Sequence, residues 1–309
     1  MKRLLMIMVS LFGAVTSGLS AGDLIPLTFP AGSRVVAMNE GLYGGAVGND
    51  PAFFYNSGGP GKFESFIPGL RMSILGMSSQ VAAGQSLTGT PMVWNMATGV
   101  YTELSTMGGF ATDVNESGVV VGRVNTPEGA PSAFVYQGGV FTSLGTFGAS
   151  SATAVSINNL NQIAINVTKP GGVRSGVVYD MATGTLTQVI GLGGNTLLNG
   201  ISDEGKLSGK TGGVVAIGKP NDMGQYQMVA LSHMIPPGID IVDIQATSAG
   251  GALLVSDASG QEYRLAAGVY SQDFPGNNVP DAGASAYLLG AVLPFVVYFG
   301  RKEQKFQCG

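Results

Sequence analysis

The pattern of apolar and polar positions is clearest between residues 111 and 150, which read ATDVNESGVVVGRVNTPEGAPSAFVYQGGVFTSLGTFGAS. Four short segments, ATDVN, VVVGRVN, AFVYQ and VFTSL, alternate apolar with polar positions or are rich in β-branched and aromatic residues. The intervening ESG, TPEGAPS and GG are typical of turns. Apolar residues do not recur at the spacing of a helix face. The stretch therefore predicts a unit of four short strands.

The first turn of this unit recurs along the chain. Asparagine and glycine tolerate left-handed backbone, and an asparagine side chain can bond its own turn, so these residue types suit a tight hairpin. Weaker matches occur at Met77 and Thr247, and successive turns are spaced by about 38 to 45 residues. The predicted repeat-turn positions are Asn39, Asn115, Gly118, Asn158, Ser202 and Gly205.

Repetition at this period predicts an all-β fold, a β-propeller of about six four-stranded blades across residues 21–270. One such sheet cannot bury both of its faces, so neighbouring copies must pack together. The fifth and sixth repeats are degenerate, which leaves five or seven blades open, and a sandwich or a β-solenoid is the alternative fold. The strand Leu24–Phe29 lacks a unit of its own, and we expect it to close the ring by pairing into the last repeat.

Residues 1–20 resemble a secretory signal peptide. Two basic residues precede an apolar run over residues 4–15, and Gly18 and Ser20 supply small residues before a cleavage site. An uncleaved anchor or an ordinary core strand is the alternative, but the run is short for a membrane span. We therefore expect the protein to be exported.

The pattern changes again after residue 270. A polar linker, residues 271–278, precedes the sequence VPDAG, an apolar run over residues 284–300 and a basic pair. Seventeen helical residues span roughly 25 Å, the short end for a bilayer. We predict that the segment 279–309 is a transmembrane sorting helix or, alternatively, a permanent anchor. Its motif residues are Val279, Pro280, Asp281, Ala282 and Gly283, and its basic stop is Arg301 and Lys302.

Composition narrows the class of protein. Charged residues make up only 11% of the 309, the 49 glycines suit tight turns, and the formal net charge is −4. Without its two basic ends the chain carries a charge of about −8 and keeps no basic cluster, so we expect no nucleic acid partner. The single cysteine, Cys308, cannot form an internal disulfide.

Residues 100–168 resemble the HAF-type extracellular repeat of bacterial surface and secreted proteins. The similar runs are ATDVNESGVVVG, AFVYQGGVFTSLGTFG and LGTFGASSATAVSINNLNQIAINV. The match is fair at residues 35–56 and 196–209 and poor beyond residue 218. The resemblance implies a propeller-like exported repeat domain and no established chemistry.

The order of motif, apolar run and basic pair at the C-terminus is similar to the PEP-CTERM class of sorting signals, and closest to its VPDSG variant. Ala282 stands where that variant usually has Ser or Gly, and the tail beyond Lys302 is longer than expected. The resemblance implies recognition by an exosortase in the inner membrane, cleavage near the motif, and transfer to the outer envelope or exterior.

The residues offer little catalytic chemistry. His233 is the only histidine, so a zinc or nucleophilic site would lack partners of matching type. The run starting at Asp113 begins like a calcium loop but has Val124 where a bidentate Glu is required. The acidic pairs Asp203-Glu204 and Asp240 with Asp243 fit solvated positions better than glycoside hydrolysis. We predict no catalytic, cofactor-binding or metal-binding residues.

Two function classes follow. The first is a non-enzymatic, exported cell-surface or extracellular-matrix repeat protein that is processed by an exosortase, passes transiently through the inner membrane and contacts exopolysaccharide. The second is a secreted carbohydrate-active enzyme, a lyase or hydrolase, on the same propeller. Three or more carboxylates converging on the central channel would favour the enzyme.

Overall fold

The computed structural model describes residues 24–39, 42–56, 63–66, 71–127, 129–221, 223–235 and 238–267. These residues form strands and one short 3-10 helix, η1 (Leu231–His233), with no helix among them that is long and apolar enough to cross a membrane. The predicted signal peptide, the motif at residues 279–283 and the basic pair at 301–302 lie outside the described residues.

The strands form antiparallel groups of four, which we call units one to six. Unit one contains β2 (Ser33–Asn39), β3 (Leu42–Val47), β4 (Asp50–Asn56) and β5 (Phe63–Phe66). Unit two contains β6 (Met72–Met77), β7 (Val81–Ser86), β8 (Pro91–Asn95) and β9 (Tyr101–Glu103). Unit three contains β10 (Gly109–Val114), β11 (Val120–Asn125), β12 (Pro131–Gln137) and β13 (Val140–Gly145).

The second half of the chain repeats this order. Unit four contains β14 (Ser151–Ile157), β15 (Gln162–Thr168), β16 (Arg174–Asp180) and β17 (Thr185–Ile190). Unit five contains β18 (Thr196–Ile201), β19 (Leu207–Thr211), β20 (Val214–Pro220) and β21 (Tyr226–Ala230). Unit six contains β22 (Ile241–Thr247), β23 (Leu253–Asp257), β24 (Glu262–Leu265) and the N-terminal β1 (Leu24–Leu27).

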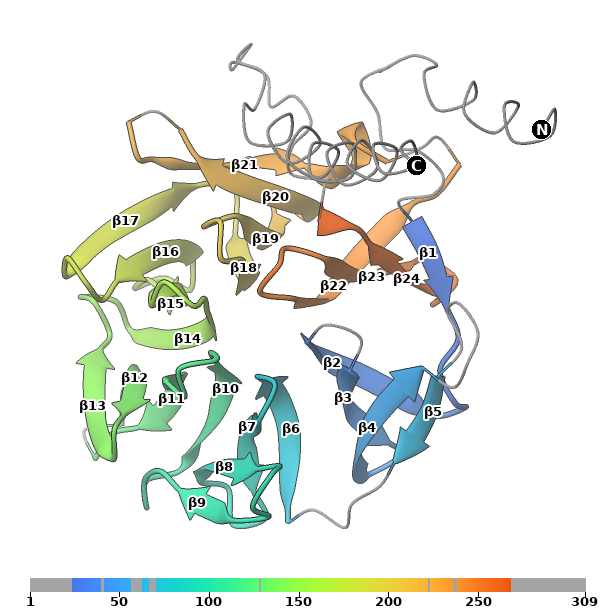
Figure 1. Ribbon diagram of the computed structural model, residues 1–309. Helices are drawn as coiled ribbons and strands as arrows, with labels where there is room; N and C mark the ends of the chain where they lie inside the picture. Colours follow the sequence, from blue (N-terminus) through green and yellow to red (C-terminus); the bar gives the residue numbers. More distant parts are fainter. Residues whose placement is uncertain are drawn as a thin grey trace, which may run out of the picture. The chain divides into compact units, whose positions relative to one another are not determined.

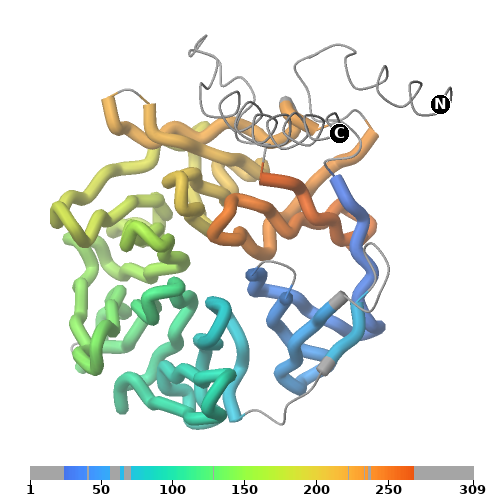
Figure 2. Tube along the Cα trace, in the orientation of Figure 1, coloured from blue at the N-terminus to red at the C-terminus, as the bar shows by residue number. Residues whose placement is uncertain are grey.

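The units stand around a central axis in a β-propeller-like arrangement (Figure 1). The first strand of each unit lies nearest the axis and the fourth lies outermost, so the trace in Figure 2 steps outward and then returns to begin the next unit. Units four and five also form one eight-stranded sheet, because β17 pairs in parallel with β21 at Val189↔Tyr226 and Ile190↔Gln227. The expected all-β propeller fold is therefore observed.

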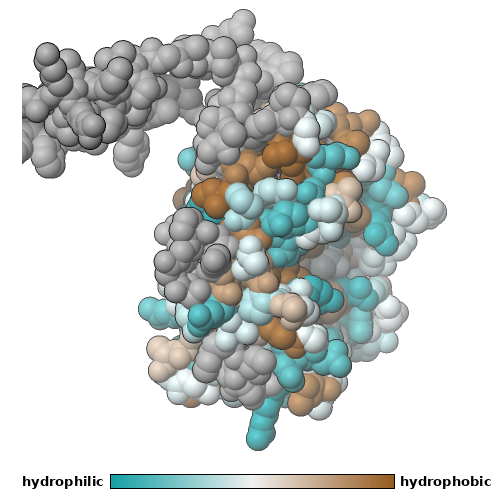
Figure 3. Space-filling model, turned by 90° about the vertical axis from the view of Figure 1, so that its right-hand side faces the viewer, coloured by the Kyte–Doolittle hydropathy of each residue, from teal (hydrophilic) through white to brown (hydrophobic). Residues whose placement is uncertain are grey.

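Apolar side chains fill the space between neighbouring units. One buried cluster joins Ala83 of unit two to Phe134 of unit three, and another joins Tyr43 of unit one to Leu254 of unit six. Fully burying one such large side chain stabilises the fold by about 1.5–3 kcal/mol. Each sheet thus gains its stability from the next one. On the side that carries β1 and β5, hydrophobic and hydrophilic residues are interspersed on the surface (Figure 3).

The N-terminal strand closes the ring. β1 pairs antiparallel with β24, with Leu24 opposite Leu265 and Leu27 opposite Glu262. The ring of Phe29, just beyond β1, lies 5.4 Å from that of Tyr43 in unit one, so the closing strand also contacts the next unit. The predicted pairing of this segment into the last repeat is confirmed.

Shortening Leu27, which is 4% exposed in the core between units six and one, should lower stability markedly. We expect Leu27→Ala to cost about 2–5 kcal/mol of unfolding free energy. Deleting residues 24–27 should cost more and lower the melting temperature by at least about 10 °C. Val140→Ala, at a position 64% exposed, is the matched control in thermal denaturation. An unchanged melt after the deletion would contradict ring closure.

Candidate functional site in the central channel

The innermost strands share a β-bulge three residues before the turn that follows them. At each bulge one residue of the innermost strand has no partner in the neighbouring strand. The bulge changes the direction of that residue's side chain. All these residues line the central channel. They are Val36, Leu75, Thr112, Val155, Asn199 and Gln245.

Two of these residues bond directly to the following unit. Thr112 Oγ1 donates to the carbonyl of Ala154 at 2.8 Å, and Asn199 Nδ2 donates to the carbonyl of Ile244 at 2.8 Å. Both acceptors directly precede the bulge of the next innermost strand. The bulge therefore turns a side chain towards a backbone carbonyl of the next unit.

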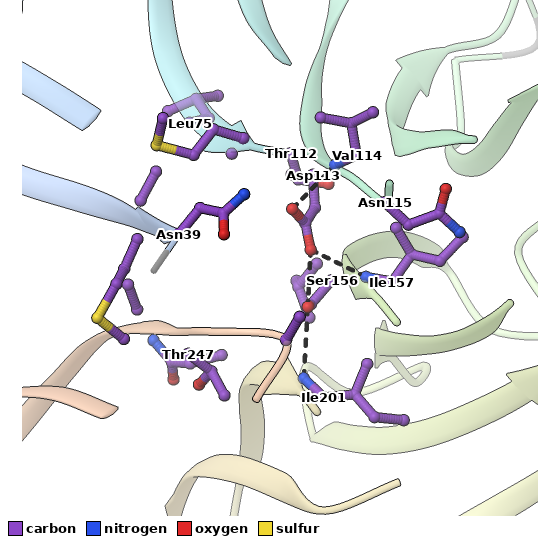
Figure 4. Close-up of a pocket in the computed structure, with 18 of the residues that line it drawn as sticks. Asn39, Leu75, Thr112, Asp113, Val114, Asn115, Ser156, Ile157, Ile201 and Thr247 are labelled. Carbon is purple, nitrogen blue, oxygen red and sulfur yellow. Dashed lines mark hydrogen bonds between the residues drawn. The ribbon is translucent and has the colours of Figure 1, made fainter. Parts of the chain in front are cut away.

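The residue after each bulge lies against the neighbouring strand. A Cβ on Gly76 would lie 2.3 Å from the Thr112 carbonyl oxygen, and a Cβ on Gly200 would lie 2.4 Å from the Thr247 Cβ. At the same position units three and four carry Asp113 and Ser156, which bond across the gap instead of avoiding it. The innermost strands thus leave a cavity of about 60 Å³ on the axis (Figure 4).

Asp113 is the most strongly engaged side chain of the channel (Figure 4). Its Oδ2 accepts a bond from Ser156 Oγ at 2.8 Å and one from the Ile157 N–H at 3.0 Å. Its Oδ1 accepts from the Val114 N–H at 2.9 Å. Ser156 Oγ in turn accepts from the Ile201 N–H at 3.3 Å, so one network joins units three, four and five.

Burial controls the ionisation of Asp113. Loss of water around the carboxylate raises its pKa from 3.8 to about 6, and the bonds from Ile157, Ser156 and Val114 offset only part of this effect. Glu116 behaves differently. Burial raises its pKa, but bonds from Ser79 and Asn39 outweigh that effect and hold the pKa below its usual value.

A second line of hydrogen bonds follows the turns. In units two to five, the residue after the turn position uses its N–H to reach the corresponding residue of the next unit. The Ser79 N–H donates to Glu116 Oε1 at 2.9 Å, and the Glu116 N–H donates to Asn159 Oδ1 at 2.9 Å. The Asn159 N–H donates to Asp203 Oδ1 at 2.8 Å, and the Asp203 N–H donates to the Ala249 carbonyl at 2.8 Å. We call this series the turn relay.

The turn asparagines have two roles at once. Asn158 Oδ1 accepts the N–H groups of Leu160 and Gln162 and so closes its own turn. Its Nδ2 donates to the Ser202 carbonyl of the next unit at 2.8 Å. Asn115 likewise closes its own turn and donates to the Asn158 carbonyl at 3.1 Å. Serine at the equivalent Ser202 accepts a bond within its turn from the Lys206 N–H at 3.2 Å.

The structure places the predicted repeat-turn residues as follows. Asn39 ends β2, and its Nδ2 donates to Glu116 Oε1 at 3.0 Å. Gly118 and Gly205 have left-handed backbone and donate to the carbonyls of Asn115 and Ser202. Two weaker sequence matches are shifted by one residue, because Ser78 and Ser248, instead of Met77 and Thr247, occupy the turn position and cap the turn.

Three of the acidic residues considered above for glycoside hydrolysis form hydrogen bonds or ion pairs within the fold. Asp203 accepts two bonds from Asn159, Glu204 pairs with Lys206, and Asp243 pairs with Lys210 at 2.9 Å. Within the described residues no three His, Cys, Asp or Glu side chains are grouped so as to hold a metal ion.

Sequence reasoning missed the contacts between units. The apolar and polar pattern marks neither Thr112 nor Asn199, and by itself it does not predict the turn relay. One signal was available: Glu116, Asn159 and Asp203 directly follow the turn residue in three successive repeats, and all have side chains that accept hydrogen bonds.

Comparisons with known proteins show the fold. No protein-family model matches the chain, and no curated sequence matches it. A gluconolactonase, XC5397 from Xanthomonas campestris, has a TM-score of 0.50 at 10% identity, over 81% of this chain and 94% of that one. The calcium-binding protein regucalcin from Agrobacterium tumefaciens has a TM-score of 0.47 at 15% identity, over 78% and 90% of the two chains.

A third similar structure is TolB from Acinetobacter baumannii, with a TM-score of 0.45 at 18% identity over 68% of this chain. The match spans just over half, 55%, of the TolB chain. At these identities the likeness shows the propeller fold alone. Because one fold hosts many functions, it does not decide between an enzyme and a binding protein.

The dual role of Asn158 is testable. Asn158→Ser keeps an acceptor for the turn but removes the donor to Ser202, so we expect it to lose about 0.5–1.5 kcal/mol of unfolding free energy. Asn158→Ala should lose more, because the turn N–H groups also lose their acceptor. Asn95→Ser is the control, since Asn95 Oδ1 bonds its own turn on an outer strand. Equal losses for Asn158→Ser and Asn95→Ser in urea unfolding would argue against the bond between units.

Asp113 should make stability depend on pH. Its pKa is raised in the folded state, so folding favours the protonated form, and this contribution is lost as the pH rises from about 4 through about 6. The loss is at most about 3 kcal/mol. We expect the melting temperature of Asp113→Asn, relative to the parent chain, to rise between pH 4 and pH 7. A difference that stays constant with pH would refute the assignment.

Proposed function

We propose that this protein is an exported, non-enzymatic propeller of six blades, which is sorted to the cell surface or extracellular matrix and contacts exopolysaccharide there. The blade count is supported by the six antiparallel units. The parallel pairing between β17 and β21 involves two residue pairs, so units four and five count as separate blades.

The non-enzymatic proposal rests on the hydrogen bonds that the carboxylates around the channel accept from neighbouring units. Asp113 accepts bonds from units three and four, and Glu116 accepts from Ser79 and Asn39. A general acid or base needs hydrogen-bonding reach to its substrate. Here the carboxylates that line the channel hold neighbouring blades together, which supports a structural and binding role.

Export and sorting are supported by the order of segments in the sequence. Leu24 and Leu265 are paired residues of β1 and β24. The described chain therefore enters and leaves unit six at the same end of its sheet.

The alternative is a secreted carbohydrate-active enzyme. Asp113 favours it, because a carboxyl with a raised pKa in a central cavity is a common feature of active sites. Polysaccharide cleavage that Asp113→Asn abolishes, while leaving the fold intact by circular dichroism, would decide for the enzyme.

The sorting proposal predicts a change in localisation when residues 279–283 are deleted. We expect the parent chain in the outer envelope or medium, with a C-terminus near the motif by mass spectrometry. The deletion variant should stay in the inner membrane at full length. Ala282→Ser, which restores the usual residue of the resembling motif, is the control and should be processed. An intact C-terminus on the mature parent chain would rule out sorting by cleavage.

A further inference from the structure

A groove of about 620 Å³ opens on unit four, separate from the central channel. Its floor contains Val177, which is 7% exposed, and its walls come from β15, from β17 and from the loop that joins β13 to β14. The walls carry Phe147, Lys169, Leu186 and Gln188. This volume is within the usual range of small-ligand sites.

The backbone of Phe147, in the wall of the groove, is strained. Its φ of 55° lies in the left-handed region, which bulky residues rarely adopt. Of the described non-glycine residues only Asn161 shares this region, and asparagine tolerates it well. The Phe147 ring lies 6.0 Å from the ring of Tyr179 at 46°. Such strain costs on the order of 1–3 kcal/mol and concentrates at ligand sites.

The groove is locally basic in an acidic protein. Lys169 begins a short hairpin closed by the bond from its N–H to the Val173 carbonyl at 2.8 Å, and Arg174 follows at once. The sequence contains no Asp or Glu between Glu128 and Asp180. Asp180 ends β16 at the opposite end from Arg174, and its carboxylate accepts the N–H groups of its own turn.

We propose that this groove binds a hexuronate residue of an acidic polysaccharide. The sugar's C–H face packs on the ring of Phe147, its carboxylate meets the Lys169 ammonium, and its hydroxyls bond to the Gln188 amide. A charge-assisted bond gives preference for an acidic over a neutral sugar. This inference rests on the proposed contact with exopolysaccharide and names its site and its chemical class.

The test is calorimetric titration of the full chain in detergent with tetragalacturonate, and with maltotetraose as the neutral probe. We expect binding of tetragalacturonate to be tighter than that of maltotetraose and to weaken with salt. Lys169→Gln should weaken it about tenfold and remove the preference over the neutral probe. Phe147→Asn, which suits left-handed backbone but removes the ring and its contact with the core, should weaken both probes while the fold stays intact by circular dichroism.

Two variants serve as matched controls. Arg34→Gln removes an exposed cation from unit one, and Leu160→Asn changes an apolar residue that is 60% exposed in a turn of unit four. Both should bind tetragalacturonate as the parent chain does. No binding at millimolar probe, equal affinity for the two probes, or unchanged affinity in Lys169→Gln and Phe147→Asn would each overturn the proposal.

Failure here is separable from failure of the proposed function. A chain that reaches the surface but does not bind tetragalacturonate would remove the groove assignment and leave sorting intact. A chain that binds the probe but is never exported would overturn sorting and leave the groove.

Discussion

The fold depends on polar backbone groups that one sheet cannot satisfy alone. The turn residues Asn115 and Asn158 are buried at the channel, and a buried polar group without a hydrogen-bond partner costs about 1–3 kcal/mol. Both amides donate to carbonyls of the next unit, and the turn relay adds N–H donors from units two to five, as when Glu116 donates to Asn159. Units two to five are therefore completed by the unit that follows each of them, and the pairing of β1 with β24 closes the ring.

The apolar layers and the polar axis act together. Clusters such as the one joining Ala83 to Phe134 press neighbouring sheets together but set no position along the strands. Directional bonds set it, because Thr112 reaches the Ala154 carbonyl in one alignment of the two units. The close approach at Gly76 and Gly200 then leaves no space for sliding. Non-directional burial supplies most of the stability and the hydrogen bonds supply the alignment.

The use of channel carboxylates for bonds between units bears on function. Asp113 and Glu116 at the channel bond neighbouring units, and Asp113 retains a raised pKa while it does so. Groups that form no hydrogen bonds between units are the ones free to contact a ligand. The groove on unit four has such groups, where Lys169 and Gln188 border an apolar floor and Phe147 has left-handed backbone.

The sequence by itself determined the all-β class, the period of about forty residues and the strands of the best repeat, because hairpin turns are made by residues close together in the chain. It also indicated that the segment beginning at Leu24 belongs to the last sheet. It misplaced the turns at Met77 and Thr247 by one residue, since the serines that cap those turns have weaker turn preferences than asparagine. Only the tertiary structure decided the bulges, the turn relay, the β17–β21 pairing and the strained Phe147. These features arise from contacts between residues far apart in sequence, or from packing that selects one backbone conformation among several. Apart from the acceptor side chains that follow the turn residue in three successive repeats, neither cause leaves a local pattern.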